Sequence, residues 1–128
     1  MEQPQPSRVL LVEDDAAARA GYAKFLTLSG YAVLEAATGE AGLMAANAWH
    51  PDVIVLDLVL PDIDGWEIAR QLKATPRTQA VPIIALTGAG LPHERVSAMR
   101  AGCERHLAKP CVPEELLRAI QLCITSAS

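Results

Sequence analysis

Apolar residues occur along the chain in short continuous runs that alternate with longer amphipathic stretches. The runs have the length of β-strands and lie at residues 8–12, 31–36, 53–56, 82–86 and 105–108. The stretches between and after them predict helices at residues 16–29, about 38–50, 66–74, 92–101 and from 113 to about 124. Local signals agree with these limits: Asp15 is a suitable N-cap for the first helix, and Gly30 follows its end.

Strict alternation of short buried strands with helices favours a parallel sheet that is covered by helices on both faces. Right-handed crossovers with helices on both sides require the winding to reverse, and a reversal after the second strand gives the strand order 2-1-3-4-5. The pattern therefore predicts an α/β protein, a (βα)5 doubly wound parallel five-stranded sheet in three α/β/α layers. Residues 8–124 form the expected domain, with disordered or loose tails at 1–7 and 125–128.

Composition and charge restrict the possible partners. A chain of 128 residues is long enough for one domain with its own core. The formal net charge of −4 disfavours nucleic acid as the main partner, because phosphate binding needs a clustered basic surface. No apolar stretch reaches the length of a membrane span, and the polar first seven residues do not resemble a signal peptide, so we expect a cytoplasmic protein with reduced cysteines.

Acidic residues follow two strands that are neighbours in the predicted order. Glu13, Asp14 and Asp15 come after the first strand, and Asp57 comes after the apolar run 53–56. An ionised aspartate is rarely buried alone, so we expect Asp57 to lie just beyond its strand, at the carboxyl edge where open α/β sheets bind ligands. Four carboxylates without a nearby His or Cys favour a hard cation, above all Mg²⁺.

Two further residues at the same edge are suited to phosphate. Thr87 ends the fourth strand and Lys109 ends the fifth, just before Pro110. A hydroxyl and an ammonium group beside Mg²⁺ are typical of sites that hold phosphoryl oxygens.

Taken together, these fragments resemble the receiver domain of two-component response regulators, a family with the flavodoxin-like fold. The resemblance covers about residues 8–124, and it rests on fragments that occur in the right order and at the right spacing. They are Leu10-Leu11-Val12-Glu13-Asp14-Asp15, Asp57 with Pro61 and Asp64-Gly65, Ala85-Leu86-Thr87, and Lys109-Pro110.

The resemblance implies a role for each residue of the predicted site. Asp57 would be the nucleophile that accepts a phosphoryl group as an acyl phosphate. Glu13 and Asp14 would be the acidic pair that binds Mg²⁺, with Asp14 the more direct ligand and the main-chain carbonyl of Val59 completing the set. Asp15 falls outside the pair.

It also implies how the strand ends would respond to phosphorylation. Thr87 and Lys109 would contact the phosphoryl oxygens, and the Lys109–Pro110 peptide bond would be cis. Thr87 and the Gly88-Ala89-Gly90 loop would then move together with the following helix.

The chain departs from the family pattern near the site. The family usually has Tyr or Phe three residues before the lysine, where this chain has His106, and we expect His106 to act as the switch residue, with pH dependence. Cys111 replaces the frequent Phe after Pro110. Val59 and Ala89 offer no polar group that would position water, so we expect slow self-dephosphorylation.

The implied partners are a histidine kinase or histidine phosphotransfer protein and a downstream protein target, which would bind the surface of the fourth helix, fifth strand and fifth helix. On this reading the protein is a signalling phosphoacceptor and not an enzyme that turns over a separate substrate. Two alternatives stay open: a small Mg²⁺-dependent aspartyl phosphatase, and a degenerate receiver that acts only as an interaction module. The phosphatase would usually need a second Asp two residues after the first, where Val59 stands.

Overall fold

The computed structural model describes residues 5–88, 96–97 and 100–127. Its sheet has five parallel strands in the order β2-β1-β3-β4-β5, which confirms the predicted doubly wound fold. The strands are β1 (Arg8–Val12), β2 (Ala32–Ala36), β3 (Val53–Asp57), β4 (Ile83–Thr87) and β5 (Arg105–Ala108). The helices with defined bounds are α1 (Ala16–Leu28), α2 (Gly39–Trp49), α3 (Gly65–Ala74) and α5 (Pro113–Ala127).

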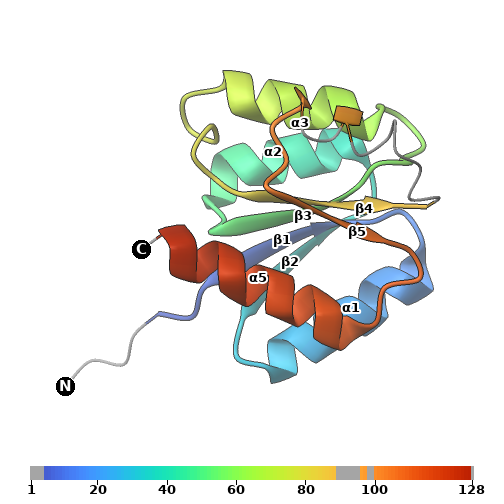
Figure 1. The fold of residues 1–128 in the computed structure, drawn as a ribbon, viewed down its shortest axis with the longest axis vertical. Helices are drawn as coiled ribbons and strands as arrows, with labels where there is room; N and C mark the ends of the chain where they lie inside the picture. Colours follow the sequence, from blue (N-terminus) through green and yellow to red (C-terminus); the bar gives the residue numbers. More distant parts are fainter. Residues whose placement is uncertain (1–4, 89–95, 98–99, 128) are drawn as a thin grey trace.

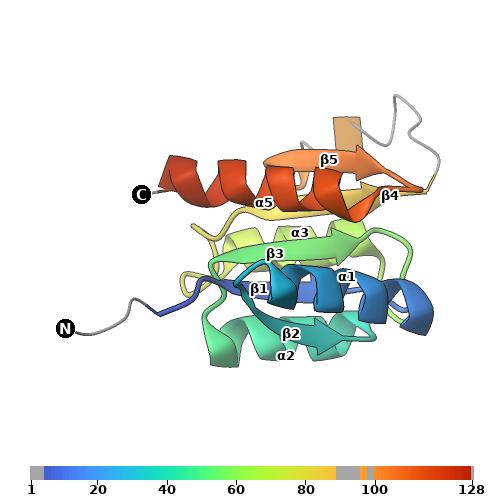
Figure 2. The same cartoon turned by 90° about the horizontal axis from the view of Figure 1, so that it is seen from below.

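The sheet separates two apolar cores. Helices α2 and α3 cover one face of the sheet, and α1 and α5 cover the other (Figures 1 and 2). Alternate side chains of β3 enter different cores: Ile54 and Leu56 pack on the α2–α3 side, whereas Val53 and Val55 pack on the α1–α5 side. Because both faces of β3 are buried, its residues form a continuous apolar run and do not alternate with polar ones.

The helix limits agree with the sequence signals in most places. The Asp15 carboxylate caps α1 by accepting from the Ala18 N–H at 3.1 Å, and Gly30 adopts φ 102° after the helix ends. At the other end of the chain α5 continues to Ala127, so residues 125–127 of the expected tail are helical. Most of the helix expected at 92–101 lies outside the described residues, of which 96, 97 and 100 are helical.

Polar side chains join three elements at the amino edge of the sheet. The Lys73 ammonium at the end of α3 donates to the Val81 carbonyl at 2.9 Å and pairs with the Glu104 carboxylate at 2.8 Å. The other oxygen of Glu104 accepts from the Ile83 N–H at 2.6 Å. These contacts fix the starts of β4 and β5 to the end of α3. No helix in the described part of the chain has both the length and the hydrophobicity that crossing a membrane requires.

Candidate functional site

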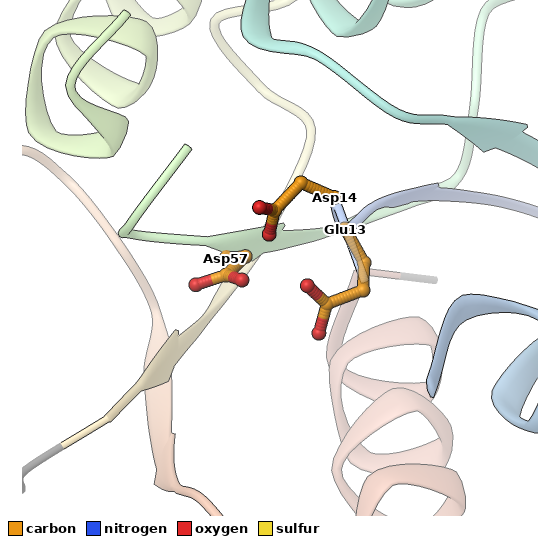
Figure 3. Close-up of side chains that lie close together, drawn as sticks. All are labelled: Glu13, Asp14 and Asp57. Atoms are coloured by element: carbon orange, nitrogen blue, oxygen red, sulfur yellow. The ribbon is translucent and has the colours of Figure 1, made fainter. Parts of the chain in front are cut away.

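Three carboxylates meet at the carboxyl edge of the sheet, where β1 and β3 lie side by side (Figure 3). Glu13 and Asp14 directly follow β1, and Asp57 is the last residue of β3. Each contributes one oxygen to a group whose members lie within 4.8 Å of one another. This is the crevice beside the point where the strand order reverses, as the predicted topology requires.

The environment of Asp57 differs from the sequence-based expectation. We expected Asp57 to lie beyond the strand, but it belongs to β3 and is only 3% exposed. Specific contacts replace the missing solvent: the Lys109 ammonium lies 2.8 Å from Oδ2, and the Val59 N–H donates to Oδ1 at 3.0 Å. A buried carboxylate is stable here because both of its oxygens have donors.

Lys109 also pairs with Glu13. Its Nζ lies 2.8 Å from Glu13 Oε1, and the Glu13 side chain is fully buried. The Lys109 backbone N–H donates to the Thr87 carbonyl at 2.7 Å, and the Lys109–Pro110 peptide bond is cis. One ammonium group therefore joins the acidic residue after β1 to the acidic residue of β3.

The buried charges shift one another's titration. Burial, together with a hydrogen bond to Asp57, raises the pKa of Glu13 to about 7. Burial also acts to raise the pKa of Asp57, but hydrogen bonds with Glu13 and Lys109 outweigh it and hold that pKa below its usual value. Burial opposes the charged form of Lys109, yet the two carboxylates raise its pKa above the usual value. Asp57 is therefore ionised at neutral pH, and Glu13 is the carboxyl that can hold a proton there.

The donor set fits a hard divalent cation. Glu13, Asp14 and Asp57 supply only carboxylate oxygens, and Asp14 is exposed so that a cation with bound waters can reach it. Val59, whose carbonyl we expected to be a further ligand, follows Asp57 closely, with its N–H on the Asp57 carboxylate. Asp15 caps α1 and is not part of the group, as expected.

Thr87 is the last residue of β4 and is 1% exposed. Its hydroxyl has no hydrogen-bond partner among the residues that the structure describes. A buried hydroxyl without a partner costs free energy, so it is suited to a polar ligand that enters the site.

His106 lies away from the carboxylates, on β5, and is half-buried. It faces a hollow of about 340 Å³ between β5 and α5, which it lines with Arg105, Leu107, Glu115, Arg118, Ala119 and Leu122. Ala89, which we expected beside the phosphoryl group, and Gly90 of the same loop lie outside the described residues.

Three residues that support the site were not found from the sequence. The Arg19 guanidinium donates to the main-chain carbonyl of Glu13 at 2.7 Å, and the Tyr22 hydroxyl donates to that of Cys111 at 2.7 Å. The Asp62 carboxylate accepts from the first two N–H groups of α2, at 2.8 and 2.9 Å. The partner of each is a main-chain atom, which every residue type offers, so the sequence carries no signal for these contacts.

The fold and the acidic cluster together define a class of protein: a doubly wound α/β domain with a cation site at the point where its strand order reverses. The family model of the response regulator receiver domain matches residues 9–121. The chain belongs to this family.

Individual relatives agree with the family. The chain is 39% identical over 112 residues to "Response regulator MprA" of Mycolicibacterium vanbaalenii, an alignment that covers 88% of this chain and 48% of that protein. It is 37% identical over 123 residues to "Response regulator MprA" of Mycobacterium sp. (strain KMS), covering 96% of this chain and 53% of the relative. The chain thus spans about half the length of the curated relatives it matches.

Solved structures share the fold over nearly their whole length. A putative response regulator from Chloroflexus aurantiacus has a TM-score of 0.89 and 32% identity, with 94% of this chain and 98% of that one covered. The receiver domain of a sensor histidine kinase from Pseudomonas aeruginosa has a TM-score of 0.87 and 34% identity, with the same coverage. That structure is described with a magnesium ion coordinated in the active site cleft.

Proposed function

We propose that the chain is a phosphorylatable receiver domain in which Asp57 accepts a phosphoryl group from the phosphohistidine of a histidine kinase or phosphotransfer protein. The observation that carries the proposal is the state of Asp57: a buried carboxylate that is kept ionised and oriented by Lys109, inside a group of carboxylates suited to Mg²⁺. An ionised, oriented carboxylate is a nucleophile, and the neighbouring ammonium group offsets the charge that an incoming phosphoryl group adds.

The proposed step is a displacement at phosphorus. A carboxylate oxygen of Asp57 forms the new P–O bond while the P–N bond of the phosphohistidine breaks, and its electron pair stays on the leaving imidazole nitrogen. Lys109 and the unpartnered hydroxyl of Thr87 donate hydrogen bonds to phosphoryl oxygens. Glu13 and Asp14 would hold Mg²⁺ with Asp57 and the Val59 carbonyl, and the bound cation would neutralise phosphoryl charge.

We also propose that the domain is a phosphoacceptor and not an enzyme with turnover. Hydrolysis by an aspartyl phosphatase uses a second acid or base close to the nucleophile. Two residues after Asp57 stands Val59, whose side chain is 71% exposed and apolar. The acyl phosphate would therefore be long-lived, and a lifetime of only seconds in Mg²⁺ would contradict this part of the proposal.

The signal would pass from the site to the surface of β5 and α5, where a downstream protein binds. Thr87 is joined to Lys109 through a backbone hydrogen bond, and His106 lies on the next strand beside an open hollow. The Gly88-Ala89-Gly90 loop, of which the described residues include only Gly88, would move with Thr87. If His106 senses this change, His106→Ala will alter partner binding in at least one phosphorylation state; equal binding in both states excludes that role.

One experiment tests the main proposal. The protein is incubated with MgCl₂ and phosphoramidate, which is a small phosphodonor, and is then weighed intact by mass spectrometry. We expect one phosphoryl adduct in the wild type and none in Asp57→Asn, which has nearly the same size but lacks the nucleophilic charge. Donor turnover without an adduct would favour the phosphatase, and no reaction would favour a degenerate receiver, so either result rejects the proposal.

A further inference from the structure

Helix α1 contacts both sides of the site through two residues that are one turn apart. Arg19 donates to the Glu13 carbonyl at 2.7 Å, and Tyr22 donates to the Cys111 carbonyl at 2.7 Å. Residues three apart in a helix project from the same face, so one rigid element holds the backbone after β1 and the backbone after β5.

The segment held by Tyr22 carries Lys109. At its start, the Lys109 N–H donates to the Thr87 carbonyl at 2.7 Å, and at its end the Cys111 carbonyl accepts from Tyr22. Lysine has a long, flexible side chain, so the position of its ammonium group depends on where its backbone is fixed. That group must lie 2.8 Å from both Glu13 and Asp57.

Tyr22 is close enough to the site for electrostatic interaction with its charges. Burial raises the pKa of the phenol, and the charges of Cys111, Lys109 and Glu13 also act on it. A raised pKa keeps the phenol protonated at neutral pH, and only the protonated phenol can donate to a carbonyl.

We propose that Tyr22 is a positioning residue for phosphoryl transfer: by holding the Cys111 carbonyl it places the Lys109 ammonium group between Glu13 and Asp57. This inference rests on the proposed function. It requires only the main-chain carbonyl of Cys111, so it does not depend on the departure of that side chain from the family pattern.

Tyr31 provides a matched control. Both tyrosines are partly buried and pack against the α1–α5 core, and burial raises the pKa of both phenols. In the described structure only the Tyr22 hydroxyl has a recorded hydrogen bond to the backbone that follows Lys109. Replacing each tyrosine with Phe keeps the ring and removes the hydroxyl, so the two variants differ mainly in this contact.

The test compares wild type, Tyr22→Phe, Tyr31→Phe and Asp57→Asn. Intact mass spectrometry gives the rate of phosphorylation by phosphoramidate, Mg²⁺ titration of tryptophan fluorescence gives the cation affinity, and urea unfolding gives the stability. For Tyr22→Phe we expect the rate to fall about fivefold, the scale of one lost hydrogen bond, and the Mg²⁺ affinity to stay within about twofold because the carboxylates are intact. Tyr31→Phe should match the wild type in rate.

The outcomes separate the inference from the function on which it rests. If the wild type forms no adduct, or Asp57→Asn forms the same adduct, the proposed function fails. If the wild type is phosphorylated on Asp57 and Tyr22→Phe reacts at the wild-type rate, the positioning role is wrong even when its unfolding midpoint has fallen. Equal rate losses in the two Phe variants would also overturn it, because the Tyr31 hydroxyl makes no such contact.

Discussion

Gly65→Ala should disturb the site from behind the nucleophile. Gly65 is the first residue of α3, and its N–H donates to the Leu58 carbonyl at 3.2 Å. An added Cβ would lie 2.5 Å from Leu58 Cα and 2.9 Å from the carbonyl oxygen of Asp57. Both atoms belong to the backbone, so no side chain can rotate to make room.

The size of the effect follows from these distances. Ordinary van der Waals contact begins at 3.4 Å, so a separation of 2.5 Å forces the backbone to move by the better part of an ångström. Overpacking usually costs about 1–3 kcal/mol, and we expect about 2–3 kcal/mol here because the backbone must yield. The displaced segment carries Asp57, and misplacement by about 1 Å can slow a reaction by about 100-fold.

Urea unfolding and phosphorylation by phosphoramidate measure the two effects. Gly21→Ala is the control: a Cβ at Gly21 in α1 meets nothing within 4 Å, so alanine should stabilise the helix by about 0.5–1 kcal/mol and leave the rate unchanged. The reasoning is refuted if Gly65→Ala unfolds at the wild-type urea concentration and reacts at the wild-type rate.

Three further predictions concern the metal-free protein. Asp62→Ala should lower the free energy of unfolding by about 1–2 kcal/mol, because the start of α2 loses two acceptors; urea unfolding that matches the wild type would contradict this. Cys103, buried and with its pKa raised to about 12, should resist iodoacetamide at pH 8 until urea is added; rapid labelling of the folded protein would show that it is accessible. The folded-state pKa of Glu13, about 7, lies above its ordinary 4.5, so its contribution to stability is present at low pH and lost as pH rises through 7. Glu13→Gln in EDTA should therefore reduce the loss of stability between pH 6 and 8 by about 1 kcal/mol, whereas an unchanged pH dependence would assign that titration to another group.

The sequence was sufficient for the sheet and for the members of the acidic cluster. Alternation of apolar runs with amphipathic stretches determines a parallel sheet, and the carboxyl ends of neighbouring strands then necessarily bring Glu13, Asp14 and Asp57 together. The Asp15 cap was also predictable, because a cap and its helix are adjacent in sequence. These features depend on local pattern and on the general rules of strand order.

Features that depend on contacts between distant residues were not predictable in the same way. The burial of Asp57 depends on Lys109, which is 52 positions away in the chain, and the sequence assigned that lysine to phosphoryl oxygens without indicating its pairing with Glu13. Tyr22 and Asp62 act on main-chain atoms of segments that only the folded chain brings near. A sequence pattern shows which side chains are available, but it does not show which backbone they hold.

The position of Asp57 within β3 has a consequence for how the domain can respond to modification. β3 is the middle strand, hydrogen-bonded on both sides to β1 and β4 and buried on both faces. Displacing it would break two ladders and open two cores, so the acceptor stays where it is when a phosphoryl group is added. The free energy of modification must then appear as rearrangement of the neighbours, such as the end of β4 and the segment after β5. An immobile acceptor thus makes phosphorylation a signal that is read outside the residue that carries it.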